Sequence, residues 1–193
     1  MERELLVTGI GGQGVQLMAT VLAQAALSEG RGVQLFGSYG GMMRGGSTDA
    51  TLVVADGPVQ SPPTVGAAWS AILMHHEHAP GTLAHVRPGG VVLLNTSVCG
   101  RAVAGTDHAV TEVAATDVAA GLGDPLVAAM VMAGAYAAYT GLVSLDTLRR
   151  AAAASLPARR ARHAARNDEA LVAGSGLVPA LGAPAWALEA SAS

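Results

Sequence analysis

The residues of this chain most able to do chemistry lie in two glycine-rich segments. The first runs Gly9-Ile-Gly-Gly-Gln-Gly14, between a short apolar run and a stretch with helical spacing of apolar residues. A glycine turn between a strand and a helix presents backbone N–H groups at the positive end of the helix dipole. Such a turn suits a phosphate, a carboxylate or the polar backbone of a partner protein.

Gly9, Gly11 and Gly14 have the spacing of the dinucleotide fingerprint, but the rest of that pattern is missing. The fingerprint places an acidic residue about twenty positions further on, where it binds a ribose hydroxyl. This chain has Leu35-Phe-Gly-Ser38 at that place. A dinucleotide is therefore disfavoured. Two interpretations stay open with equal weight: an anion site, or glycines that only allow a strand and a helix to pack tightly.

The second segment is Ser38-Tyr-Gly-Gly-Met-Met-Arg-Gly-Gly-Ser47, in which four glycines surround Arg44. In a parallel sheet both glycine segments would emerge at the carboxyl edge, where ligands and partners bind. Arg44 could there offer a planar, bidentate donor to a carboxylate or phosphate. The alternative is an arginine that satisfies nearby loop carbonyls. The flanking glycine pairs favour the functional interpretation.

Three further groups of residues invite a chemical interpretation, and a plainer one competes with each. His75, His76 and His78 surround Glu77, but adjacent residues after a strand point to different faces, so a polar strand end is favoured over a metal site. Cys99 has no evident base nearby and is expected to be a small, semi-buried residue. Six arginines gather near the C-terminus and predict solvated helix faces or a dock for an acidic partner: Arg149, Arg150, Arg159, Arg160, Arg162 and Arg166.

Composition limits the class of protein. The 193 residues suffice for one domain with a full core, and 51% of them are hydrophobic while 13% are charged. A net charge of −3 argues against a nucleic-acid partner, and a single cysteine cannot form an internal disulfide, an iron–sulfur cluster or a cysteine-based zinc site. The acidic N-terminus predicts no signal peptide, and the uncharged run from Leu126 to Val143 is too rich in Ala and Gly for a membrane span. We therefore expect a cytoplasmic protein.

Strand and helix signals alternate along the chain. Strands are expected at Leu5–Thr8, Val33–Phe36, Asp49–Ala55, Ala71–Met74, Val91–Asn95 and Ala109–Ala115. Helices are expected at Val15–Glu29, Pro80–Val86, Asp117–Leu122, Pro125–Thr140 and Leu145–Ser155, with Ser144 as N-cap, and a last helix should end at Ala173. Arg87-Pro-Gly-Gly90 reads as a turn, and the first 36 residues as a βαβ unit.

The alternation predicts a doubly wound α/β fold. Its mostly parallel sheet would have helices on both faces, in a three-layer, Rossmann-like arrangement. Residues 1–178 are expected to form this single domain. The Ala/Ser/Pro-rich residues 179–193 are expected to be a loosely held tail.

Taken together, the two glycine segments, about twenty-five residues apart, resemble the gamma subunit of 2-oxoacid:ferredoxin oxidoreductases. This family includes the pyruvate, 2-oxoglutarate, branched-chain and indolepyruvate enzymes. The resemblance covers about residues 4 to 176. Three further segments carry it: Arg87-Pro-Gly-Gly-Val-Val-Leu-Leu-Asn95, the glycine-containing helix near Met130–Ala138, and Asn167-x-x-Ala170-x-x-x-Gly174.

The chain departs from the family pattern at two places. Ala67-Ala-Trp69 stands where the family has an Ala-Asp pair, and Ala128 or Ala129 replaces an Asn early in the long helix. The Ser-Tyr-Gly before Arg44 is closer to the 2-oxoglutarate type. These departures leave a second hypothesis open, a stand-alone nucleotide- or coenzyme-binding protein of the same fold.

The resemblance implies a role in a complex. Such enzymes decarboxylate a 2-oxoacid on thiamine diphosphate, pass electrons through iron–sulfur clusters to ferredoxin, and transfer the acyl group to coenzyme A. Gly123-Asp124 continues with Pro125, so it is not the thiamine-binding pattern. The cofactors are therefore expected on alpha and beta partner subunits, with no catalytic residue, metal or cofactor held by this chain alone. Ferredoxin would be reached only indirectly, and a homodimer of the chain stays an open alternative.

The resemblance also implies contacts with coenzyme A or a partner chain at the two glycine segments. The residues assigned to these contacts are Gly9, Gly11, Gly12, Gln13, Gly14, Tyr39, Gly40, Arg44, Gly45, Gly46 and Asn95.

Overall fold

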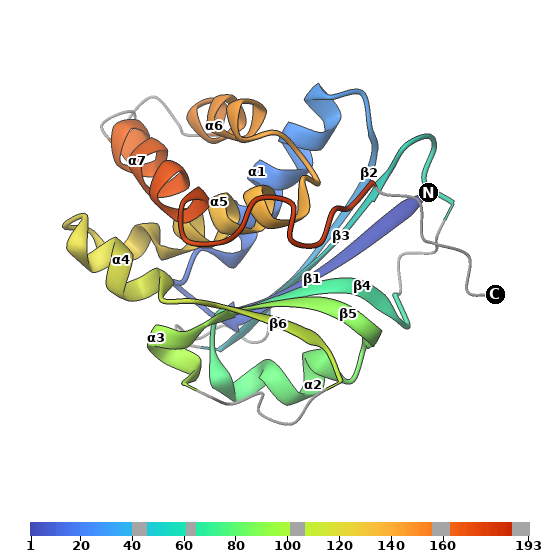
Figure 1. Cartoon of the computed structure of the whole chain (residues 1–193), viewed down its shortest axis with the longest axis horizontal. Coiled ribbons are helices and arrows are strands. Elements are labelled where there is room, and N and C mark those ends of the chain that lie inside the picture. Colours follow the sequence, from blue (N-terminus) through green and yellow to red (C-terminus); the bar gives the residue numbers. More distant parts are fainter. Residues whose placement is uncertain (40–45, 61–64, 101–106, 156–162, 187–193) are drawn as a thin grey trace.

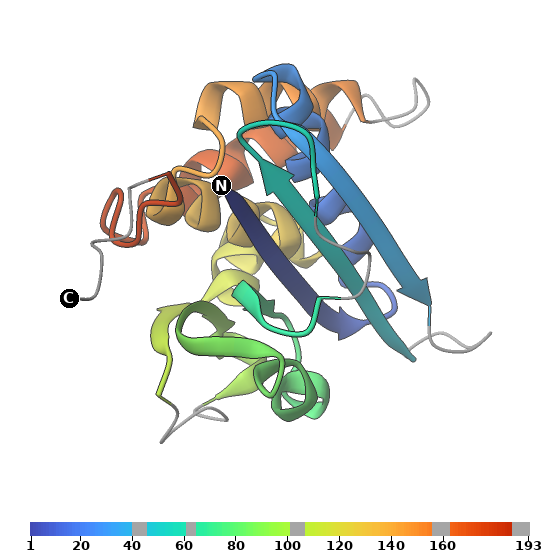
Figure 2. The same ribbon diagram turned by 90° about the vertical axis from the view of Figure 1, so that its right-hand side faces the viewer.

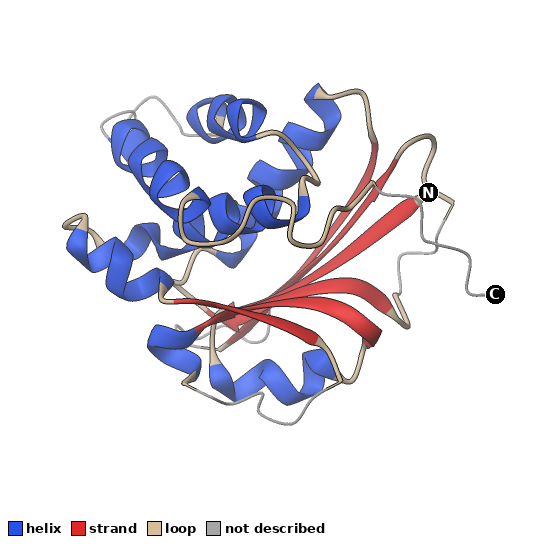
Figure 3. Cartoon of the chain, in the orientation of Figure 1, coloured by secondary structure: helices blue, strands red, loops and turns tan. Residues whose placement is uncertain are grey.

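The chain folds around one six-stranded sheet. The computed structural model describes residues 1–39, 46–60, 65–100, 107–155 and 163–186. Figures 1 and 3 show the sheet between two layers of helices, as the alternating sequence pattern predicts. The strands are β1 (Glu2–Ile10), β2 (Gly32–Tyr39), β3 (Ser47–Ala55), β4 (Ala68–Leu73), β5 (Val86–Asn95) and β6 (Ala109–Val113), in the spatial order β2-β3-β1-β4-β5-β6.

The sheet is mixed. β1, β4, β5 and β6 pair in parallel, whereas β3 lies between β1 and β2 and is antiparallel to both. Five of the six strands therefore run in one direction. The first strand, helix and second strand are not a neighbouring βαβ pair, because β3 separates β1 from β2. The connection from Tyr39 to Ser47 is too short for a crossover, so β3 must return antiparallel.

The helices divide unequally between the two faces of the sheet. One face carries α1 (Val15–Ser28), α4 (Ala115–Gly121), α5 (Ala128–Thr140), α6 (Leu145–Ala154) and α7 (Ala164–Ser175). Among the described residues, α2 (Ala79–Leu83) and α3 (Thr96–Cys99) are the α-helices on the other face. A large apolar core lies under the first group and a smaller one, which includes Leu73, Leu94 and Cys99, lies under the second.

The unequal division leaves part of the sheet without a helix. α1 packs on one side of β2 and β3. Figure 2 looks onto the opposite side of these strands, and no described helix stands in front of them.

Helices α5 and α7 cross closely through two glycines. A Cβ on Gly134 of α5 would lie 2.0 Å from the Leu171 carbonyl oxygen, and one on Gly174 of α7 would lie 1.9 Å from the Val131 carbonyl oxygen. Each helix thus presents a glycine to the backbone of the other. This packing explains why α7 continues through Gly174 to Ser175, whereas the sequence predicts its end at Ala173.

The segment after α7 packs on the domain up to Trp186. We call residues 180–186 the C-terminal strap. Backbone N–H groups of Leu181, Ala183 and Ala185 donate to the last carbonyls of α5, those of residues 138, 139 and 140, at 2.8, 3.1 and 2.6 Å. The Trp186 indole donates to the Leu142 carbonyl at 3.1 Å, and the Arg31 guanidinium lies 3.9 Å from its ring centroid. The strap therefore caps a buried helix end, which differs from the loosely held tail expected after residue 178.

Other element boundaries also differ from those expected. Arg87–Gly90 is part of β5, which begins at Val86, and the short helix before it ends at Leu83. Ser144 does cap α6, because its side chain accepts a hydrogen bond from the Thr147 N–H. Within the described ranges, no helix has both the length and the hydropathy that a bilayer crossing requires.

Candidate functional site

The two glycine segments meet at the carboxyl edge of the sheet, as predicted. Ile10, the last residue of β1, pairs with Ser47, the first residue of β3. Just beyond them, the Gly11 N–H donates to the Gly46 carbonyl at 2.9 Å. Tyr39 ends β2 at the same edge and pairs with Thr48. Gly40, Arg44 and Gly45 lie outside the described residues.

Gln13 closes the first glycine turn from inside. Its Oε1 accepts from the Ile10 N–H at 2.9 Å, and its Nε2 donates to the Met74 carbonyl at 3.0 Å. The side chain therefore ties the end of β1 to the end of β4. A Cβ at Gly9 would lie 2.7 Å from Gln13 Oε1, so Gly9 serves this close packing. What the turn offers to a ligand is its backbone.

Gly12 and Gly14 shape the backbone of the turn. Their φ angles are 101° and 77°, in the left-handed region that favours glycine. Gly12 is exposed, and no atom lies within 4 Å of the position of its Cβ. Gly14 is the N-cap of α1, which starts without a side-chain cap and without an acidic residue in its first turn. In the described part of the chain no N-cap side chain therefore binds the first N–H groups of α1, which suits an acceptor group.

The turn borders a narrow crevice of about 140 Å³, which we call the switch-point crevice. After β1 the chain passes to the α1 side of the sheet, and after β4 it passes to the α2 side, so the crevice lies where a doubly wound fold binds ligands. This volume is large enough for one narrow end of a ligand but not for a whole coenzyme. The lining residues are Gly12, Gln13, Met74, Val98, Thr116, Pro125, Leu126 and Ala128.

Asn95 does not line the crevice itself but is hydrogen-bonded to Thr116, which does. It is fully buried at the end of β5, its Nδ2 donates to Thr116 Oγ1 at 2.9 Å, and its Oδ1 accepts from the Thr116 N–H at 3.4 Å. Thr116 in turn lines the crevice, as does Leu126, whose side chain is 76% exposed. Neither residue stands out in the sequence, where the only signal is a leucine directly after a proline.

Position 129 borders the glycine turn from α5. A Cβ on Gly14 would lie 3.0 Å from the Ala129 Cβ. Ala129 is one of the two candidates, with Ala128, for the residue that replaces the Asn of the family pattern. At Ala129 the chain presents a methyl group to the turn.

Asp49 fastens the end of the second glycine segment to β1 and α1. Its carboxylate accepts from Thr8 Oγ1 at 2.5 Å and from Ser47 Oγ at 2.8 Å. The Gln16 amide of α1 donates to the Asp49 backbone carbonyl at 2.7 Å. The sequence predicted only that a strand begins at Asp49, because nothing in the pattern shows which strand lies beside β3.

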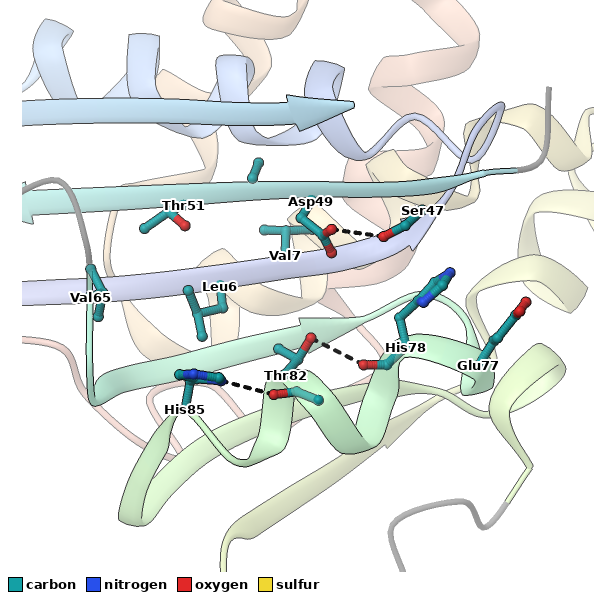
Figure 4. Close-up of a pocket in the computed structure, with 12 residues that line it drawn as sticks. Leu6, Val7, Ser47, Asp49, Thr51, Val65, Glu77, His78, Thr82 and His85 are labelled. Atoms are coloured by element: carbon teal, nitrogen blue, oxygen red, sulfur yellow. Dashed lines mark hydrogen bonds between the residues drawn. The ribbon is translucent and has the colours of Figure 1, made fainter. Parts of the chain in front are cut away.

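A groove of about 410 Å³ separates this part of the sheet from α2. Figure 4 shows Ser47, Asp49 and Thr51 on the sheet side, with His78 and His85 on the helix side. The Thr82 hydroxyl donates to the His78 carbonyl at 3.3 Å, and His85 Nδ1 lies 2.9 Å from the Gly81 carbonyl.

The histidines near Glu77 have local structural roles. His75 caps the 3-10 helix η1 (His76–His78), because its Nδ1 accepts from the Glu77 N–H at 3.3 Å. Its ring stacks on His76, with centroids 4.4 Å apart. Burial and the neighbouring His76 lower the pKa of His75. In the described part of the chain, no three His, Cys, Asp or Glu side chains come together as a metal site.

Cys99 is buried at the end of α3, and its thiol contacts the Leu73 carbonyl at 3.7 Å. Burial raises the pKa of this thiol to about 11. Because that pKa is far above neutral pH, the thiolate should be rare. We expect Ellman's reagent to modify the native protein about 100-fold more slowly than the protein unfolded in guanidinium. Equal rates in the two states would show that the thiol is accessible and ionised.

The described arginines of the C-terminal cluster are engaged with neighbouring side chains. Arg149 of α6 makes a bidentate contact with Asp168 of α7, at 2.6 and 2.8 Å, and this contact lowers the pKa of the Asp168 carboxyl. Arg166 lies 3.7 Å from Glu169, and Arg150 donates to Thr147 at 3.0 Å. Arg159, Arg160 and Arg162 are outside the described residues. Arg149 thus links two helices.

The two hydrogen bonds by which the Gln13 side chain ties β1 to β4, which we call the Gln13 clamp, can be tested by a nearly isosteric substitution. In Gln13→Glu the carboxylate can still accept from the Ile10 N–H, but it cannot donate to the Met74 carbonyl and would repel it. We expect a loss of about 1–3 kcal/mol in the free energy of unfolding, measured by urea denaturation. Gln24→Glu on the exposed side of α1 is the control for a Gln-to-Glu change away from the turn, because a carboxylate there can still accept the hydrogen bond from the Ser155 hydroxyl. Equal, small losses in both variants would contradict the clamp.

A sheet with a switch point, a glycine turn before a helix and a crevice beside it together define a doubly wound α/β domain. No strongly nucleophilic or metal-ligating group lines the described part of the crevice. The chain belongs to the pyruvate ferredoxin/flavodoxin oxidoreductase family, whose model matches residues 4–177.

Relatives in this family match the chain over segments of different length. It is 34% identical over 148 residues to the pyruvate synthase subunit PorC of Methanothermobacter thermautotrophicus, covering 75% of this chain and 80% of that one. It is 35% identical over 96 residues to the ketoisovalerate oxidoreductase subunit VorA of Methanothermobacter marburgensis. That match covers 50% of this chain but spans only 20% of VorA.

A solved structure supports the fold. The gamma subunit of a keto/oxoacid ferredoxin oxidoreductase from Geobacter sulfurreducens superposes with a TM-score of 0.76 at 24% identity. The superposition covers 90% of this chain and 96% of that subunit, so the arrangement of strands and helices is shared almost completely.

Proposed function

We propose that the chain is the non-redox gamma subunit of a 2-oxoacid:ferredoxin (acceptor) oxidoreductase complex. As a complex, this enzyme would carry out the coenzyme A-dependent oxidative decarboxylation of a 2-oxoacid. The observation that carries the proposal is the match to the family over residues 4–177, together with a match that covers 80% of a pyruvate synthase subunit. Both extend over almost the whole α/β domain rather than over one motif.

The chain's own chemistry agrees with a non-redox role. Its only cysteine is buried, with a raised thiol pKa, so it offers neither a cluster ligand nor an evident nucleophile. Thiamine diphosphate and iron–sulfur clusters would therefore belong to alpha and beta partner subunits. The contribution of this subunit would be assembly of the complex and contacts with coenzyme A, whose thiol accepts the acyl group in this chemistry.

The first glycine turn is the proposed place for these contacts. The exposed backbone of Gly11 and Gly12 and the uncapped start of α1 would hold a polar acceptor group, either of coenzyme A or of a partner's backbone. The switch-point crevice would take a narrow apolar part of the ligand. Gly40, Arg44 and Gly45 are proposed to complete the site from the second glycine segment, which joins the first through the contact between Gly11 and Gly46.

Co-purification tests the assembly. The tagged chain, expressed in its native host, should capture alpha and beta subunits in stoichiometric amounts, identified by mass spectrometry. The purified chain alone should not turn over a 2-oxoacid. Recovery of the chain without these subunits, or turnover by the isolated chain, would instead favour the stand-alone coenzyme-binding protein.

A matched pair of glycine variants tests the turn. Gly12 and Gly30 have φ angles of 101° and 78°, and neither would bring a Cβ within 4 Å of another group. Gly12→Ala and Gly30→Ala should therefore cost similar stability, about 1 kcal/mol each, but only Gly12 lies at the proposed site. We expect Gly12→Ala to raise the KM for coenzyme A of the reconstituted complex, or to reduce its assembly, and Gly30→Ala to do neither. Identical behaviour of both variants would remove the turn from the site.

A further inference from the structure

The outer edge of β2 is open in the described structure. β2 is the last strand of the sheet, β3 is the only described strand paired with it, and α1 packs on one of its sides. In an antiparallel pair, every second residue points its N–H and C=O away from the partner strand. β2 therefore presents a row of backbone donors and acceptors at its outer edge, at the free side of the sheet in Figure 2.

β2 also lacks the features that protect such an edge. Natural edge strands are usually short, bulged, or interrupted by charge or proline. β2 reads Gly32-Val-Gln-Leu-Phe-Gly-Ser-Tyr39, without a charge or a proline, and it pairs with β3 along its whole length without a shift in register. Phe36 in its middle is 41% exposed. A strand of this kind exposed to solvent would be prone to pairing with any free strand.

The opposite edge of the sheet is built differently. β6 has 5 residues, against 8 in β2, and it carries the exposed Glu112. Asp107 lies two residues before it. Shortness and negative charge are the ordinary protections of an edge. Of the two described edges of the sheet, β2 is thus the longer one and the one without charge.

We propose that β2 pairs antiparallel with β2 of a second copy of this chain, so that one sheet runs through both copies. A two-fold axis places the same strand on both sides of the contact, and antiparallel strands offer each other complementary donors and acceptors. Because β2 is uncharged, two copies meet without opposed like charges. Head-to-tail pairing of β2 on β6 would bury Glu112 beside an apolar strand and is disfavoured. The proposal goes beyond the proposed function and does not depend on it.

The mass of the chain in solution tests the proposal. We expect size-exclusion chromatography with light scattering to give twice the chain mass for the wild type at micromolar concentration. Phe36→Lys should halve that mass, because the lysines of the two copies would be brought together beside the shared edge. Val172→Lys replaces a side chain with a similar exposure, 46%, on α7 and should leave the mass unchanged. Circular dichroism would verify that each variant is folded.

Hydrogen–deuterium exchange of the wild type gives a second measurement that does not depend on a variant. The amides of β2 should be protected along the whole strand, and half of them should lose protection on dilution to the monomer. A wild-type monomer at all concentrations would overturn the proposal, as would a dimer that Phe36→Lys leaves intact. A monomer whose β2 becomes protected only on adding alpha and beta subunits would assign the edge to a partner subunit and equally overturn pairing with a second copy.

Discussion

Gly134→Ala and Gly174→Ala should each destabilise the protein strongly. The added methyl would lie 2.0 Å from the Leu171 carbonyl oxygen in the first variant and 1.9 Å from the Val131 carbonyl oxygen in the second. Backbone atoms cannot move aside as a flexible side chain can, so α5 and α7 would have to separate. We expect a loss of about 3–5 kcal/mol, or a decrease in Tm of about 10 °C for a chain of this size, measured by thermal unfolding.

Gly121→Ala is the matched control for these two variants. Gly121 is the last residue of α4, and nothing lies within 4 Å of the position of its Cβ. Alanine favours helix over glycine by up to about 1 kcal/mol, so this variant should be neutral or slightly more stable. Small, equal effects at all three positions would show that α5 and α7 do not cross as closely as the structure has them.

Removal of the C-terminal strap is the second change with a large expected effect. Deleting residues 180–193 would leave the last carbonyls of α5 without the N–H groups of Leu181, Ala183 and Ala185. It would also uncover the side of the domain where Trp186 packs. Each lost hydrogen bond contributes about 0.5–1.5 kcal/mol and the newly exposed apolar surface adds to the loss, so we expect the truncated protein to lose about 4 kcal/mol or more, measured by urea denaturation.

Two point variants separate the contributions within the strap. Trp186→Phe keeps a ring for the Arg31 guanidinium but removes the hydrogen bond to the Leu142 carbonyl. It should cost about 1 kcal/mol. Trp186→Ala removes both and should cost about 3 kcal/mol. If the truncated chain unfolded at the same urea concentration as the full chain, the strap could not be part of the stable domain.

Much of the architecture could be predicted from the sequence, because local signals and burial agree there. Every predicted strand exists, since runs such as Ala71–Met74 and Val91–Asn95 must be buried on both faces. The meeting of the glycine segments at one edge followed from the direction of the strands alone. The N-cap at Ser144 was also predictable, because its signal is local.

The parts that could not be predicted depend on contacts between distant residues. The insertion of β3 between β1 and β2 depends on which strands pair, and the apolar patterns of the three strands are alike. The helical state of Gly174 depends on the Val131 carbonyl of another helix. Residues 180–186 look like an Ala- and Pro-containing tail in the sequence, and their order depends on hydrogen bonds from their N–H groups to the last carbonyls of α5.

The location of the candidate site could be predicted from the sequence, but the side chains that form it could not. Glycine patterns show where backbone is exposed. They cannot show that the Gln13 side chain turns inward to the Met74 carbonyl, 61 residues further along the chain. The contacts of Thr116 and Asp49 could not be predicted either, because each residue contacts an element that is remote in sequence.

Arg3 in β1 donates a side-chain hydrogen bond to the Ala185 carbonyl, so the beginning and the end of the packed domain touch. A domain whose two ends are neighbours can be joined into a longer polypeptide at both sides without stretching its core. Fusion of this domain to another, or its separation as a subunit, should therefore leave the packing of its core unchanged. The same layout means that α5 gains its last hydrogen bonds only after residue 185 has left the ribosome, so this helix end is completed late in the folding of the domain.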